Sequence, residues 1–189
     1  MNNFFPVPAI PPRGEIIVLL IVVFIAAVYD LRYRRIPNWL TASGVLAGLA
    51  MNTFLLEGWR GVQLSLIGLG VAFGLYFVLY ALRAMGAGDV KLMAAIGTIV
   101  GVSYWWRIFL ITAMLGGVLG VLFALFKKRL GSTFWNVSFI LSEMVHGRPA
   151  YVGREELDVK SEKALRMPHG AIIALGTIVY LGLAKYYSD

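Results

Sequence analysis

Apolar residues fill six runs along the chain, and short polar or charged stretches separate these runs. An α-helix rises 1.5 Å per residue, so about 20 apolar residues cross the roughly 30 Å hydrocarbon core of a bilayer. Three of the runs have at least 18 residues and three are shorter. We therefore expect an all-α fold, a polytopic membrane helical bundle that forms one membrane-embedded domain over residues 1–189. Its six transmembrane helices are expected at about 14–31, 39–56, 62–82, 90–106, 108–126 and 168–184.

Two segments between these spans carry their own signals. The turn between the fourth and fifth spans is predicted at Tyr104-Trp105-Trp106-Arg107, because interfacial aromatics and a charge are typical of a helix leaving the hydrocarbon. The long loop 127–167 has apolar residues at helical spacing from Phe134 to Val145. This spacing predicts an amphipathic helix on the cytoplasmic membrane surface, as a lid over the bundle or as a guide for a substrate.

Glycines four residues apart recur in the predicted spans and place two small residues on one helix face. Small residues at this spacing let helix backbones approach each other, so we expect a closely packed bundle. The pairs are Gly44 and Gly48, Gly70 and Gly74, Gly97 and Gly101, and Gly116 and Gly120.

The composition and the placement of charge exclude several classes of protein. Charged residues make up 14% of the chain, whereas a soluble domain has about 25%. The net charge of +7 does not indicate a nucleic-acid partner, because the basic residues stand in short groups between apolar runs. Six spans put 13 of the Lys and Arg residues on one side and 4 on the other, so the first side is predicted to be cytoplasmic and both termini periplasmic. The absence of cysteine excludes disulfides, thiolate metal sites and a cysteine nucleophile.

Two acidic residues lie where a charge is costly. Eight of the ten acidic residues fall in loops or near the termini, but Asp30 closes the first span and Asp89 opens the fourth. An ionisable group in a span indicates function, because placing it in the hydrocarbon costs about 3 kcal/mol or more. Since Asp30 ends an odd-numbered span and Asp89 begins an even-numbered one, we expect both at the cytoplasmic face.

Two carboxylates at similar depth suit a hydrolytic reaction. They can share one proton, because like charges a few Å apart do not both ionise easily. One would act as general base on a water molecule while its protonated partner donates to a peptide carbonyl, which requires no metal and no cofactor. Gly86 and Gly88 would let an extended peptide approach Asp89. Alternatively, Asp89 complements the dipole of its own helix, and Asp30 forms an ion pair with a nearby arginine.

The residues around both aspartates resemble the motifs of a known family. Gly86-Ala87-Gly88-Asp89 matches the GxGD motif of intramembrane-type aspartic peptidases, and with Val90-Lys91-Leu92 it is similar to the second aspartate motif of bacterial type IV prepilin peptidases. Asp30, followed by Arg35-Ile36-Pro37-Asn38-Trp39-Leu40-Thr41, resembles the first motif of that family. Met167-Pro168-His169-Gly170-Ala171-Ile172 gives a weaker similarity at the last span.

The resemblance implies an aspartic endopeptidase with Asp30 and Asp89 as its catalytic pair. It would remove the leader of type IVb (Flp-like) pilin precursors at the cytoplasmic face of the cell inner membrane. Without cysteine, the zinc site of the larger bifunctional members cannot form, so the chain is similar to the short peptidase-only form of Tad/Flp pilus systems. The implied partners are a prepilin-type peptide substrate and membrane lipids.

Five further residues are candidates for positioning the substrate, namely Gly86, Gly88, Lys91, Pro37 and Asn38. Pro37 and Asn38 equally suit a simple turn into the second span. Lys91 lies two residues beyond Asp89 and would point to another helix face, which favours a lipid headgroup as its partner. His169 is either an acid–base contact or, more simply, a structural residue at a helix start.

Two rival functions stay open at the level of sequence. A small proton- or cation-coupled transporter would use the two aspartates to bind its coupling ion. Carriers usually hold such sites near the midplane and show internal repeats, whereas this sequence has no visible repeat. An inactive pilus-assembly scaffold is the second rival, and the presence of both aspartates argues against it.

Overall fold

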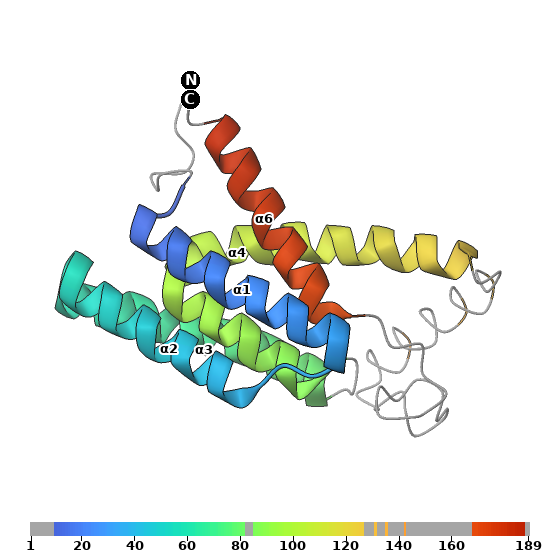
Figure 1. Ribbon diagram of the computed structural model, residues 1–189, viewed down its shortest axis with the longest axis horizontal. Helices are drawn as coiled ribbons and strands as arrows, with labels where there is room; N and C mark the ends of the chain where they lie inside the picture. The colour runs from blue at the N-terminus through green and yellow to red at the C-terminus, as the bar shows by residue number, and fades with distance from the viewer. Residues whose placement is uncertain are drawn as a thin grey trace.

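The structure, a computed structural model, describes residues 10–81, 85–126 and 168–187 and the single residues Gly131, Trp135 and Ser142, with only the backbone at 55–57. All regular secondary structure in these residues is helical. Apart from Trp135 and Ser142, the predicted amphipathic helix of the 127–167 loop lies outside the described residues. In chain order the elements are α1 (Arg13–Tyr33), α2 (Asn38–Met51), the π-helical segment η1 (Asn52–Glu57), α3 (Trp59–Ala81), α4 (Ala87–Phe126) and α6 (His169–Tyr186) (Figure 1).

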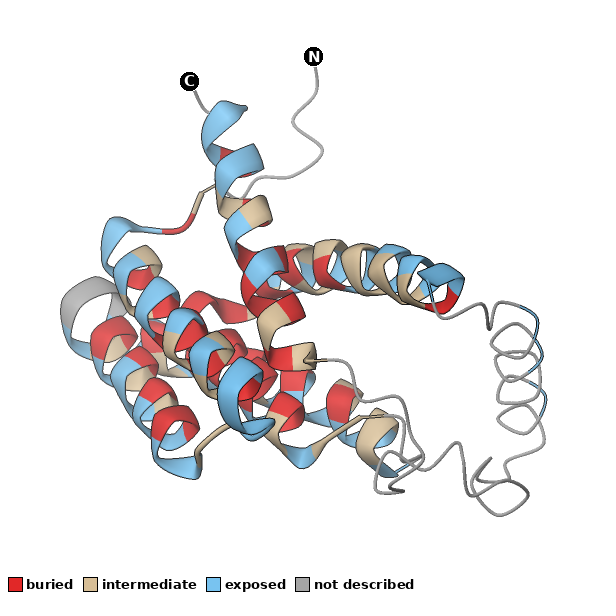
Figure 2. Cartoon of the chain, turned by 45° about the vertical axis from the view of Figure 1, so that its right-hand side comes forward, coloured by how far each residue is buried: buried red, intermediate tan, exposed pale blue. Residues whose placement is uncertain are grey.

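Apolar side chains cover much of the outside of the bundle. The helices α1, α3, α4 and α6 are each long and apolar enough to cross a membrane. Large side chains such as Phe24, Phe77 and Met114 are exposed on them, while buried residues gather where the helices meet (Figure 2). Soluble proteins rarely expose so much apolar surface, so these faces suit contact with lipid. The described residues thus confirm an all-helical fold with four helices able to cross a membrane. The predicted count of six spans is not confirmed.

Helix α4 has 40 residues, which would extend about 60 Å, twice the thickness of a hydrocarbon core. Its backbone leaves helical geometry at Gly101, with φ 70° and ψ 171°, and Figure 1 shows the chain changing direction within α4. Glycine adopts a positive φ readily because it has no Cβ. The predicted turn at Tyr104–Arg107 is therefore wrong. Trp105 is fully buried rather than interfacial, and its ring stacks on Phe109 with the centroids 5.5 Å apart.

Side chains from neighbouring elements stabilise the break in α4. The last carbonyl groups of a helix have no intrahelical donor, and a change of direction creates such groups. The Asn52 side-chain amide donates to the carbonyl groups of Thr98 and Ile99, both at 3.1 Å. The Ser65 hydroxyl donates to the Thr98 carbonyl at 3.0 Å. These buried contacts tie η1 and α3 to α4 just before Gly101.

Close backbone packing places the first half of α4 in the centre of the bundle. A Cβ built on Gly48 would lie 2.8 Å from the Cα of Ile99, and one built on Gly97 would meet the backbone of Gly68. The prediction of close packing from glycine spacing is confirmed for α2 and for this half of α4. It is wrong for three glycines around which the described residues leave open space, namely Gly70, Gly74 and Gly120.

Candidate active site

Asp30 lies in the last turn of α1, and its side chain is directed at the start of α6. Helix α1 ends because Arg34 is left-handed (φ 53°), and the Arg34 N–H donates to the Asp30 carbonyl at 2.9 Å. The N–H groups of Gly170 and Ala171 donate to Asp30 Oδ2 at 2.8 and 3.3 Å. The first N–H groups of a helix lack intrahelical partners and form a natural site for an anion. The carboxyl group of Asp30, which is 8% exposed, thus joins α1 to α6.

Asp89 lies in the first turn of α4 and is 9% exposed. Its Oδ2 accepts from the Gly86 N–H at 3.3 Å, and the Gly86 carbonyl accepts from the Asp89 N–H at 3.2 Å. The contact of the Asp89 side chain with the Gly86 N–H is one half of a capping box, so the interpretation of Asp89 as a residue that stabilises the helix start has support. The same contact fixes the orientation of the carboxyl group, which a catalytic carboxyl group also requires.

The structure brings Asp30 and Asp89 to the same end of the bundle. The C-terminal end of α1 and the N-terminal ends of α4 and α6 lie together there (Figure 1), and the charges of the two carboxyl groups interact. The side chain of Ile36 contacts the backbone next to each of them. A Cβ built on Gly88 would lie 3.2 Å from Ile36 Cβ, and one built on Gly170 would lie 3.0 Å from Ile36 Cδ1. The two glycines, one preceding Asp89 and the other bound to Asp30, therefore make room for the Ile36 side chain.

Pro37 and Asn38 form the turn from α1 into α2. Pro37 occupies the N-cap of α2 in an extended conformation (φ −66°, ψ 140°). The Asn38 side chain accepts a hydrogen bond from Lys91 Nζ at 2.9 Å. Two residues along a helix correspond to a rotation of about 200°, so Lys91 and Asp89 occupy different faces of α4. Of the predicted positioning residues, Gly86 and Gly88 lie beside Asp89, whereas Lys91 and Asn38 meet on another face.

At the start of α6, sequence analysis considered His169 but gave no role to Gly170 or Ala171. Gly170 and Ala171 hold Asp30 across a separation of 140 and 141 positions. The weak motif at 167–172 was a signal for this segment, but local spacing does not reveal its partner. His169 is partly buried, and its charge also interacts with that of Asp30.

Tyr76 on α3 is a second residue that sequence analysis did not select. It is 2% exposed, and its ring packs edge-on against Phe109 with the centroids 5.9 Å apart. The Tyr76 hydroxyl interacts electrostatically with Asp89. No signal in the sequence distinguishes this tyrosine from the other aromatic residues of the apolar runs.

The chemistry available here rests on the two carboxyl groups. Within the described ranges, no group of three or more His, Asp or Glu side chains converges as a metal site requires. Two oriented carboxyl groups at one end of a bundle can take a proton from one reactant and give it to another. The arrangement therefore suits general acid–base catalysis.

Comparisons with known proteins point to one family. The family model described as the type IV leader peptidase family matches residues 17–121. A prepilin leader peptidase/N-methyltransferase of Klebsiella pneumoniae is 30% identical over 106 residues, which are 53% of this chain and 46% of that protein. One from Xanthomonas campestris pv. campestris is 28% identical over 140 residues, 66% of this chain and 49% of that protein. The chain thus spans about half the length of the curated relatives it matches, and no solved structure matches it.

Proposed function

This chain belongs to the type IV leader peptidase family, and we propose that it is an aspartic endopeptidase that removes the leader of prepilin-type precursors. The observation that carries the proposal is that two buried carboxyl groups lie at the same end of the bundle, where their charges interact. Each is held through Oδ2 by backbone N–H groups, Asp30 by the start of α6 and Asp89 by Gly86. Both aspartates lie within the segment that the family model matches.

In the proposed reaction the two carboxyl groups share one proton. The ionised group takes a proton from a water molecule, whose oxygen attacks the carbonyl carbon of the scissile peptide bond. The protonated group donates to the carbonyl oxygen. The proton taken from water then passes to the leaving nitrogen as the carbon–nitrogen bond breaks, and one hydroxyl proton of the intermediate returns to the carboxyl pair. Water is the only co-reactant, so the reaction requires no metal and no cofactor.

The substrate is proposed to meet the enzyme at the start of α4. The absence of a Cβ at Gly86 and Gly88 lets the backbone of an unwound leader junction approach Asp89. Pro37 and Asn38 shape the turn that places Ile36 against Gly88 and Gly170. Type IVb (Flp-like) precursors of Tad pilus systems are the proposed substrates, supported by the motifs around the two aspartates and by the lack of cysteine in this sequence.

Co-expression with a Flp-like prepilin tests the proposed function in a host that lacks its own prepilin peptidase. We expect the precursor to be shortened by its leader, as measured by immunoblotting and by mass spectrometry of the new N-terminus. The same host expressing the prepilin alone is the control and should leave the precursor intact. A membrane-inserted protein that leaves every prepilin encoded next to its gene uncut would contradict the proposal. Ion uptake by proteoliposomes that contain this protein would then favour the transporter.

We also propose a six-span topology with the site at the cytoplasmic face of the inner membrane and both termini in the periplasm. The proposed spans are α1, α2 with η1, α3, the two parts of α4 on either side of Gly101, and α6. Two observations support it. The end of α1 meets the start of α6, so these two helices run in opposite directions, and α4 changes direction at Gly101.

The cysteine-free chain allows a direct test of this topology. Arg60→Cys, at the start of α3, is expected to react with a membrane-impermeant maleimide in intact spheroplasts. Arg32→Cys, at the end of α1, should react only after lysis, because the positive-inside rule places that end in the cytoplasm. Both residues are exposed, so access and not burial decides the labelling. The opposite pattern would contradict the orientation, and equal labelling of both would contradict the number of spans.

A further inference from the structure

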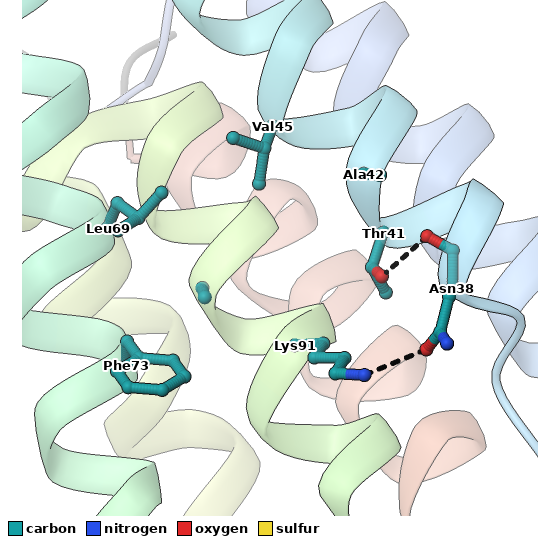
Figure 3. Close-up of a pocket in the computed structure, with 8 residues that line it drawn as sticks. Asn38, Thr41, Ala42, Val45, Leu69, Phe73 and Lys91 are labelled. Atoms are coloured by element: carbon teal, nitrogen blue, oxygen red, sulfur yellow. Dashed lines mark hydrogen bonds between the residues drawn. The ribbon is translucent and has the colours of Figure 1, made fainter.

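A groove lies beside the candidate active site, between α2 and α3, with α4 as its floor (Figure 3). Its volume is about 380 Å³. Asn38 and Lys91 give it a polar end, and Thr41 lies next to Asn38. The rest of the lining is apolar and consists of Ala42, Val45, Leu69, Phe73 and Ala94.

The polar end of the groove carries a cation at the same end of α4 as Asp89. Lys91 Nζ donates to Asn38 Oδ1 at 2.9 Å, and both residues are exposed. An ammonium group has three donors, so this contact leaves it able to bind an anion. Figure 3 shows Val45 and Leu69 at the opposite end, farther from the polar pair. The groove therefore has one cationic end and one apolar end, in the order that a lipid headgroup and its chain require.

The groove is short and largely apolar. From Asn38 to Val45 it runs about 10 Å along α2. Apolar side chains over this length suit the part of an acyl chain that lies next to its headgroup.

We propose that this groove binds a phospholipid with an anionic headgroup. The phosphate lies at Lys91, and one acyl chain passes Phe73 and then Leu69 and Val45 towards the bilayer interior. An anionic phospholipid is favoured over a zwitterionic one, because Lys91 supplies a cation at the level of the lipid headgroups. The bound chain fills the space between α2 and α3 next to the Pro37–Asn38 turn. Lipid binding in this groove would not require the proposed peptidase activity.

Native mass spectrometry of the full chain in detergent tests this site with three probes: dioleoylphosphatidylglycerol, dioleoylphosphatidylcholine and inorganic phosphate. The wild type is expected to retain one phosphatidylglycerol in preference to phosphatidylcholine. Lys91→Gln should weaken retention of phosphatidylglycerol about fivefold, while Lys91→Arg preserves it. Ala42→Phe, at an exposed lining position, should weaken retention of both lipids by filling the groove.

Arg32→Gln is the matched control, because it removes another exposed cation near the same end of the bundle. It should leave lipid retention unchanged, and size-exclusion chromatography should show all four variants folded. Equal retention by Lys91→Gln and the wild type, or equal loss in Arg32→Gln, would overturn the proposal. Complete displacement of phosphatidylglycerol by inorganic phosphate would also overturn it, as would a raised KM for prepilin in Ala42→Phe with lipid retention unchanged.

Discussion

Replacing Asp30 or Asp89 by asparagine is expected to lower the rate of prepilin cleavage by about 10²–10⁴-fold. Asparagine preserves the shape of the side chain and an oxygen that can accept the backbone N–H groups, but it cannot take or give a proton. Initial rates with purified precursor in detergent measure the effect. Because the two groups act as a unit, the double variant should be no slower than the slower single variant.

Glu15→Gln is the matched control for these two variants. Glu15 is a buried carboxyl residue, 7% exposed, at the opposite end of α1 from Asp30. Neutralising it tests whether the loss of any buried carboxylate from this helix is enough to stop cleavage. We expect Glu15→Gln to cleave at a rate close to that of the wild type. A membrane-inserted Asp30→Asn or Asp89→Asn variant that cuts the same bond at the wild-type rate would rule out the two-aspartate mechanism.

Gly170→Ala is expected to lower kcat by about 10²-fold with a smaller change in KM, because a displacement of about 1 Å is enough to misplace a catalytic group. The added methyl group would lie 3.0 Å from Ile36 Cδ1 and 3.1 Å from both Cβ and Oδ2 of Asp30. These contacts push Asp30 away from the N–H groups that hold it. Steady-state kinetics on the purified protein separates kcat from KM.

A control and a rescue distinguish misplacement from general damage to α6. Gly182→Ala adds the same methyl group to the same helix at a position with no atom of the described residues within 4 Å, so its activity should be unchanged. Ile36→Val shortens the nearest side chain and should restore part of the lost kcat when combined with Gly170→Ala. Full activity of Gly170→Ala alone would show that the start of α6 does not position Asp30.

The helices themselves follow from local sequence. A chain segment in hydrocarbon must satisfy its own backbone hydrogen bonds, so long apolar runs become helices wherever they occur. The expected spans 62–82 and 168–184 correspond closely to α3 and α6. The position predicted for the break in α4 was wrong, because aromatic residues beside an arginine indicate a membrane interface even when they are buried. The carbonyl groups before Gly101 find their donors in Asn52 and Ser65, which no local pattern reveals.

The sequence by itself determined that this is an all-helical membrane protein with two carboxylates at unusual positions, because apolarity and the cost of a buried charge are properties of the residues. Its motifs also identified the family. Only the tertiary structure decided what holds each carboxylate. Asp30 is bound by Gly170, 140 positions away, and Ile36 packs against both Gly88 and Gly170. Such contacts depend on which helix ends meet, and helical periodicity carries no information about that.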